Sequence, residues 1–149
     1  MRRMVLVTEV NHLNDVLDDD NVLDPEAVHK EDIPPGVEVF EINGPFFFGA
    51  ADKFEDTIRQ MKKRPKVLIL RLRFVPAVDA TGLHALENLL KRTKKDGTVV
   101  IFSGVHAQPL KILREAGIIA HLGEDHFYWD IKKALEYAKK VIDSAEIKS

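Results

Sequence analysis

The stretch VDATGL, residues 78–83, marks a point where a strand gives way to a helix. The apolar residues before it end at Val78, and an amphipathic pattern starts at Gly82. Asp79 lies between the two and can accept hydrogen bonds from the unpaired N–H groups of the first helical turn. Its negative charge is also favoured at the positive end of the helix dipole. The stretch therefore predicts a strand–loop–helix unit with a capping aspartate.

Two interpretations of this stretch stay open from its residues. The structural interpretation needs a capping acid at position 79 and a glycine at position 82 for close packing. The functional interpretation notes that an exposed helix N-terminus at the carboxyl edge of a strand is where α/β sheets bind ligands and partners.

Outward from residues 78–83, strand and helix patterns alternate along the chain. Residues 67–70 (VLIL) form a continuous apolar run, typical of a strand buried on both faces. Because the patterns alternate, they predict one α/β domain over residues 1–149, in which a mainly parallel sheet of about four to five strands packs with about four to five helices. The first pair of strands is expected to be antiparallel. The other strands are predicted at 4–10, 37–42, 98–102 and 126–128, and the helices at 50–63, 82–95, 109–117 and from 131 onward.

An acidic segment follows the first predicted strand. Residues 11–32 contain eight acidic side chains against one lysine, a net charge of −7, so the other residues sum to +5. The segment has few large apolar residues and ends at Pro34-Pro35-Gly36. We expect a flexible insertion over about residues 11–33. The spacing of a calcium-binding loop is missing from it, which favours a solvated acidic loop.

Composition excludes several classes of protein. The chain has 149 residues, 45% of them hydrophobic and 31% charged, and its net charge of −2 gives no general attraction to nucleic acid. It has no cysteine, which excludes disulfides and thiolate metal sites. No stretch approaches the roughly 20 apolar residues that span a bilayer, so we expect any role at a membrane to be on its aqueous side.

No catalytic, metal or phosphate-binding motif is found. None of the six histidines stands at metal-ligand spacing with an acid or a second histidine. Glycine-rich phosphate loops are absent, and Ser103 lacks the glycines of a nucleophile elbow. We therefore expect no enzymatic activity, no metal and no cofactor.

A second stretch, FEINGPFFFGAADKF at residues 40–54, turns the chain before a helix. Three successive phenylalanines cannot all point into one core, so at least one should be exposed and available for contact. The alternative is a loop that folds over the helix end and buries all three rings. The candidate interaction residues are Pro45, Phe46, Phe47, Phe48 and Gly49.

Both stretches resemble one known family, the STAS domains. These domains share their fold with anti-sigma factor antagonists and with the cytoplasmic C-terminal part of SulP-type anion transporters. Residues 78–83 resemble the family's signature loop, here Asp79, Ala80, Thr81 and Gly82. Residues 40–54 are similar to the start of the domain in SulP transporters. In the antagonists the position of Ala80 carries a phosphorylated hydroxyl, which alanine lacks, and Thr81 could be modified only as a substitute.

The resemblance implies a non-catalytic regulatory and interaction domain of a sulfate-like anion transporter, at the cytoplasmic face of the membrane. The isolated domain would be soluble. The implied partners are the membrane domain of the parent transporter and a second STAS domain; nucleotide binding is known for some members. The alternative is a free-standing anti-sigma factor antagonist that acts by partner switching. Because both loops follow strands of a parallel sheet, residues 45–49 and 79–82 should lie at the same end, with Phe47 or a neighbouring ring as the anchor.

Overall fold

The computed structural model describes residues 8–15, 28–61 and 64–148. Its centre is one five-stranded sheet whose strand order in space follows the sequence. The first pair of strands is antiparallel and the other pairs are parallel, which confirms the predicted mainly parallel sheet. The strands are β1 (Glu9–His12), β2 (Val37–Asn43), β3 (Val67–Phe74), β4 (Val99–Ser103) and β5 (Phe127–Tyr128).

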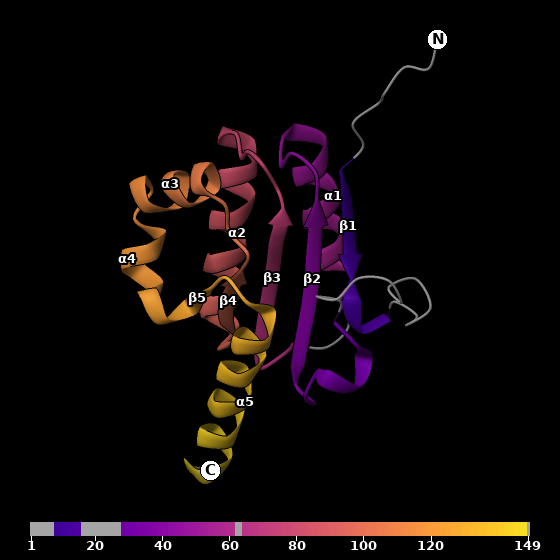
Figure 1. Ribbon diagram of the computed structural model, residues 1–149, viewed down its shortest axis with the longest axis vertical. Helices are drawn as coiled ribbons and strands as arrows, with labels where there is room; N and C mark the ends of the chain where they lie inside the picture. The colour runs from indigo at the N-terminus through magenta and orange to yellow at the C-terminus, as the bar shows by residue number, and fades with distance from the viewer. Residues whose placement is uncertain (1–7, 16–27, 62–63, 149) are drawn as a thin grey trace.

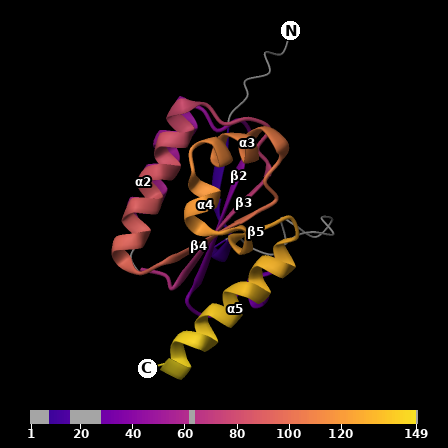
Figure 2. The ribbon, with the colours of Figure 1, turned by 90° about the vertical axis from the view of Figure 1, so that its left-hand side faces the viewer.

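Helices cover both faces of the sheet, so the domain has three layers. Figures 1 and 2 show α2 and the C-terminal helix α5 on opposite sides of the strands. The helices are α1 (Phe48–Arg59), α2 (Ala80–Asp96), α3 (Ala107–Glu115), α4 (Ile118–Leu122) and α5 (Ile131–Lys148). Short 3-10 turns lie at Leu13–Asp15, Lys30–Asp32 and Glu124–His126.

Side-chain alternation along the strands divides the core into two parts. Even-numbered strand residues such as Phe40 and Leu70 pack with α1, α2, α3 and α4. Odd-numbered residues such as Val39 and Ile69 pack with α5. Because successive residues of a strand point to opposite faces, a strand buried on both faces needs an unbroken apolar run, as in residues 67–70.

β3 continues past the predicted apolar run to Phe74 and carries two arginines, of which Arg71 is buried and Arg73 is half-buried. Arg71 is buried, and its Nη1 lies 3.4 Å from Glu41 Oε2 on the neighbouring strand. Arg73 Nε lies 3.1 Å from the same oxygen. Buried cations are tolerated where a carboxylate pairs with them, and Glu41 supplies that carboxylate. The sequence pattern missed this extension because the compensating charge comes from another strand.

Some described residues of the expected insertion pack against the sheet. Within the described residues, β1 covers Glu9–His12 and so extends past the predicted end at residue 10, while residues 4–7 of the predicted strand lie outside the described residues. Leu13 is buried in the core with residues of α5. The Asn14 side chain is bonded to the backbone of β2, donating to Val37 O and accepting from Val39 N, both at 2.8 Å. Val28 is buried as well. Leu13, Asn14 and Val28, which belong to the segment expected to be flexible (residues 11–33), thus pack against the rest of the domain. Residues 16–27 lie outside the described residues, and the flexibility of the segment stays a prediction.

Two differences concern the helices. α1, α2 and α3 each begin two residues earlier than expected. α4 was not predicted at all. It begins after Gly117, whose positive φ of 78° reverses the chain between α3 and α4. A five-residue helix is too short for its apolar period to stand out in the sequence.

Candidate functional site

The two stretches that the sequence analysis singled out meet at the carboxyl edge of the parallel strands. Phe46 and Val78 form an isolated parallel bridge between the loops that follow β2 and β3. The Phe46 N–H donates to Ala77 O at 2.9 Å, and the Asp79 N–H donates to Phe46 O at 3.4 Å. The prediction that both loops lie at the same end of the domain is confirmed.

A third loop is joined to this pair by a side chain of α3. Gln108 accepts a hydrogen bond from the Val78 N–H at 2.9 Å and donates one to Val78 O at 3.3 Å. The amide group thus pairs with the backbone of Val78 much as a neighbouring strand would. The first turns of α1, α2 and α3 consequently open at one end of the molecule.

Asp79 is the N-cap of α2, as expected. Its Oδ1 accepts from the Gly82 N–H at 2.9 Å and from the Thr81 hydroxyl at 2.7 Å. Burial by itself would raise the pKa of Asp79, but these hydrogen bonds, which favour the charged form, bring the pKa below its ordinary value. Asp79 is therefore a charged capping residue at neutral pH.

Gly82 allows the first turn of α2 to lie directly against the loop before α1. A Cβ atom at this position would stand 2.2 Å from Phe46 O and 2.8 Å from the Phe46 ring. Since real Cβ atoms do not approach backbone oxygens so closely, position 82 requires glycine. Ala80 and Thr81, the other two residues of the signature loop, are exposed.

The three phenylalanines after β2 have different environments. Phe46 is buried, with its ring edge-on to Phe54 at a centroid distance of 5.5 Å. Phe47 is 44% exposed and Phe48 is 68% exposed. The expectation that at least one ring is exposed is confirmed. Phe46 is a core residue, so its inclusion among the candidate contact residues is corrected.

Pro45 and Gly49 flank these rings. Pro45 is half-buried, and its carbonyl oxygen accepts a hydrogen bond from the Thr8 hydroxyl at the start of β1. Gly49 is exposed in the first turn of α1. Both residues therefore lie at the carboxyl edge of the parallel strands, and of the two Gly49 is the more accessible to a partner.

Two further aromatic residues at this edge were missed from the sequence. Phe74 ends β3 and is 54% exposed, and Trp129 follows β5 and is 64% exposed. The Arg73 guanidinium lies over the Phe74 ring, 4.4 Å from its centroid, and His106 packs edge-on against Trp129. A signal for both was available, since each is a large aromatic residue at the carboxyl end of a strand. We call Phe47, Phe48, Phe74 and Trp129 the aromatic edge; they are the exposed large hydrophobic residues of the described part of the chain.

Comparison with known proteins assigns this arrangement to a family. The family model of the STAS domain matches residues 25–134, which include both loops. The chain belongs to the STAS domain family. The resemblance drawn from residues 40–54 and 78–83 is confirmed.

Relatives described as sulfate or SulP transporter proteins match this STAS domain. A sulfate transporter family protein from Wolinella succinogenes is 45% identical, with a TM-score of 0.75 over 80% of this chain and 98% of that one. The SulP transporter STAS domain from Vibrio cholerae is 36% identical, with a TM-score of 0.65 over 75% and 88% of the two chains. YvdB of Bacillus subtilis, whose name describes a sulfate transporter, is 31% identical over 105 residues, which are 70% of this chain and 19% of YvdB. The STAS domain thus spans about a fifth of that relative's length.

The fold is also shared with the other branch of the family. An anti-sigma factor antagonist from Mycobacterium paratuberculosis matches with a TM-score of 0.65 over 89% of this chain, at 15% identity. That likeness shows the fold alone. The more similar relatives place this STAS domain with the SulP transporter type.

Within residues 8–15, 28–61 and 64–148, no group of three or more His, Cys, Asp or Glu side chains could hold a metal ion. In the same part of the STAS domain, no helix has the length and apolar character needed to cross a bilayer.

Replacing Asp79 with alanine should destabilise the STAS domain by about 1 kcal/mol, because the first turn of α2 loses its cap. Asp79→Asn should lose much less, since an asparagine oxygen can accept the same hydrogen bonds. Because the pKa of Asp79 is lowered, its contribution is present at neutral pH and is lost as the pH falls below about 4. Urea denaturation of both variants at neutral and acid pH measures this. Equal losses for Ala and Asn at neutral pH would contradict the capping role.

Proposed function

We propose that this STAS domain is the non-catalytic regulatory and interaction domain of a SulP-type, sulfate-like anion transporter, held at the cytoplasmic face of the membrane. The observation that carries the proposal is the aromatic edge beside the signature loop. Large apolar side chains exposed together are uncommon on a monomer without partners, and aromatic residues are enriched at interfaces. The similarity to SulP transporter STAS domains supplies the class of partner.

The direction of β1 supports the membrane part as that partner. β1 runs antiparallel to β2, with Glu9 opposite Asn43, so its first residue lies at the carboxyl edge of β2. Thr8 is hydrogen-bonded to Pro45 at that edge. A membrane part that precedes the domain would therefore connect to it beside the aromatic edge, and Phe47, Phe48 and residues 79–82 would face it.

The alternative function, a free-standing anti-sigma factor antagonist, is less well supported. Position 80, where the antagonists carry their phosphorylated hydroxyl, is alanine. The neighbouring Thr81 hydroxyl donates a hydrogen bond to the Asp79 carboxylate. Modifying Thr81 would place a phosphate beside that carboxylate, with like charges in contact. Association of two STAS domains and nucleotide binding, which the family resemblance implies, stay predictions.

The test measures binding of the STAS domain to the membrane part encoded in the same reading frame, held in lipid nanodiscs. Truncating an aromatic anchor typically costs at least ~2 kcal/mol, about thirtyfold in affinity. We expect losses of that order for Phe48→Ala and Trp129→Ala, with unchanged melting. Lys140→Ala on α5 is the control, because Lys140 is exposed on the far layer of the domain.

Empty nanodiscs separate binding to protein from binding to lipid. Unchanged affinity in both aromatic variants would remove the aromatic edge as the contact surface. A reading frame that encodes no apolar helices beside this domain, together with tight binding to an anti-sigma kinase, would establish the alternative function.

A further inference from the structure

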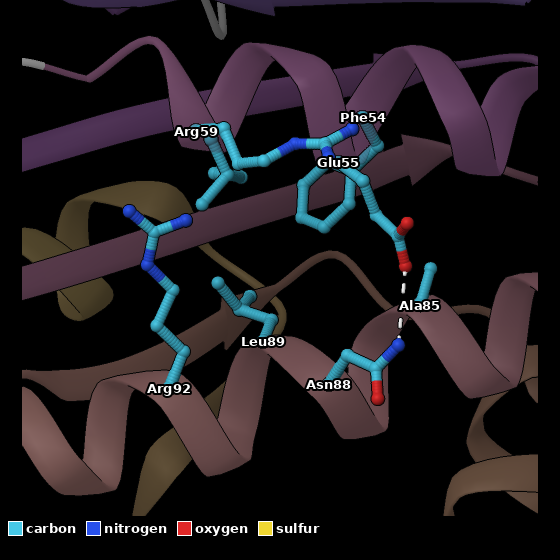
Figure 3. Close-up of a pocket in the computed structure, with 8 residues that line it drawn as sticks. Phe54, Glu55, Arg59, Ala85, Asn88, Leu89 and Arg92 are labelled. Carbon is cyan, nitrogen blue, oxygen red and sulfur yellow. Dashed lines mark hydrogen bonds between the residues drawn. The ribbon is translucent and has the colours of Figure 1, made fainter.

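A groove runs between α1 and α2, on the layer that covers the face of the sheet opposite α5. Its main hollow has a volume of about 180 Å³. Figure 3 shows the side chains that line it, with Phe54 from α1 and Leu89 from α2 facing the same space. The floor is apolar and consists of Phe54, Ile58, Ala85 and Leu89, and the rim is polar and consists of Glu55, Arg59, Asn88 and Arg92.

The groove continues toward the C-terminal ends of the two helices. A smaller hollow of about 30 Å³ shares Ile58, Leu89 and Arg92 with the first and extends to Pro65 and Asp96. At the opposite end, the Asn88 side chain donates to Glu55 Oε1 at 3.3 Å and bridges the helices. The two hollows thus form one elongated groove that the Asn88–Glu55 hydrogen bond crosses.

Some of the arginines along the groove are paired with an acidic side chain and one is not. Arg59 is paired with Asp56 on its own helix, and Arg64 lies 3.7 Å from Asp96. Arg92 lines both hollows, and Figure 3 shows it reaching from α2 toward α1. Arg92 forms no ion pair within the described residues.

The surface of α2 next to the groove is also basic. Lys91 and Lys95 are exposed beside Arg92 and form no ion pair in the part of the chain that the structure describes, whereas Lys94 lines a different hollow on the other side of α2, with Leu90 and His121. Lys91, Arg92 and Lys95 give this surface a positive charge, although the whole chain has a net charge of −2. A negatively charged partner would be attracted here.

The size of the groove decides what kind of partner fits. Pockets for small molecules usually have volumes of about 300–1,000 Å³, well above the volume found here. A hollow of this size instead suits a single apolar side chain that anchors a peptide, with its polar neighbours on the rim. We propose that the α1–α2 groove binds an acidic peptide segment of a partner protein, with an apolar side chain over Phe54 and Leu89 and a carboxylate on Arg92.

This surface is separate from the aromatic edge. The aromatic edge lies where α1 and α2 begin, whereas Arg59, Arg92 and the smaller hollow lie toward their C-terminal ends. Both surfaces can therefore be occupied at once. The groove would give a second protein access to the domain while the aromatic edge is in contact, and it does not depend on what that edge binds.

The test uses the full chain and a synthetic peptide, acetyl-Glu-Glu-Leu-Asp-Glu-Leu-Leu-Glu-Glu-amide. We expect the peptide to change the backbone amide chemical shifts of the domain most at Ala85, Asn88 and Leu89. The affinity of the domain for the peptide should fall with added salt. Arg92→Glu should lower the affinity about tenfold or more, because a charge-assisted hydrogen bond becomes a repulsion. Lys140→Glu makes the same change of charge on α5 and should lower it less than about twofold.

Two control peptides separate the contributions of charge and anchor. Serine in place of each leucine should abolish the shifts at Ala85 and Leu89, and lysine in place of each acid should abolish binding. Equal losses for Arg92→Glu and Lys140→Glu would show attraction by net charge alone and would overturn the proposal. Shift changes centred on Phe48 and Trp129, or none at millimolar peptide, would also overturn it. Thermal melting confirms that both variants are folded.

Discussion

Replacing Gly82 with alanine is expected to destabilise the domain by about 3 kcal/mol or more. An added Cβ would lie 2.2 Å from Phe46 O, so either the loop after β2 or the first turn of α2 must move. Overpacking typically costs about 1–3 kcal/mol, and a clash with backbone belongs at the upper end because the backbone has no alternative rotamer. The same change in an ordinary helix position would stabilise by up to about 1 kcal/mol. Chemical denaturation measures the difference.

Gly49→Ala is the matched control, because Gly49 occupies the first turn of α1. A Cβ there would meet no atom within 4 Å, and the residue needs no positive φ. Alanine should therefore stabilise the domain by about 0.4–1 kcal/mol. The same substitution is thus expected to have opposite signs in two helices that begin at the same edge. A neutral Gly82→Ala variant would show that the two loops are not in close contact.

Replacing Phe46 with alanine is expected to cost about 3–5 kcal/mol of folding free energy. The ring is buried, packs edge-on against Phe54, and lies next to Gly82 in the first turn of α2. Removing it would leave a cavity between α1, α2 and the ends of β2 and β3. Because a typical domain has a total stability of 5–15 kcal/mol, a loss of this size would shift the unfolding midpoint strongly.

Phe48→Ala provides the comparison for Phe46→Ala. Phe48 is two residues further along and largely exposed, so its truncation should change the folding free energy by less than about 0.5 kcal/mol. Its effect should instead be found in binding. Similar losses of stability for Phe46→Ala and Phe48→Ala would mean that both rings are core and that the aromatic edge is smaller than described.

Together these variants distinguish the residues that stabilise the two loops from the residues that would contact a partner. Phe46 and Gly82 hold the two loops against each other, whereas Phe48 and Trp129 extend outward from them. A partner that binds at this edge would meet a rigid arrangement, since the backbones of both loops are hydrogen-bonded together. Pre-organisation of this kind lowers the entropy cost of association.

The sequence by itself determined the class of fold and most of its elements. Residues 37–42 and 67–70 indicated strands through their apolar patterns, and residues 78–83 indicated a capped helix start. These features depend on neighbours a few positions apart in the chain, so they can be recognised without the tertiary structure. The same stretches carried the family resemblance, and the parallel topology followed from the alternation of elements.

The tertiary structure decided which residues of each stretch are buried. Phe46 and Phe48 are alike in sequence, but the bridge to Val78 turns Phe46 inward and leaves Phe48 outside. Leu13 and Asn14 looked like part of a solvated acidic segment until β2 and α5 provided their contacts. Arg71 is tolerated in the interior because Glu41 lies on the adjacent strand. Such outcomes depend on partners at least 23 positions away in the chain, which no local pattern records.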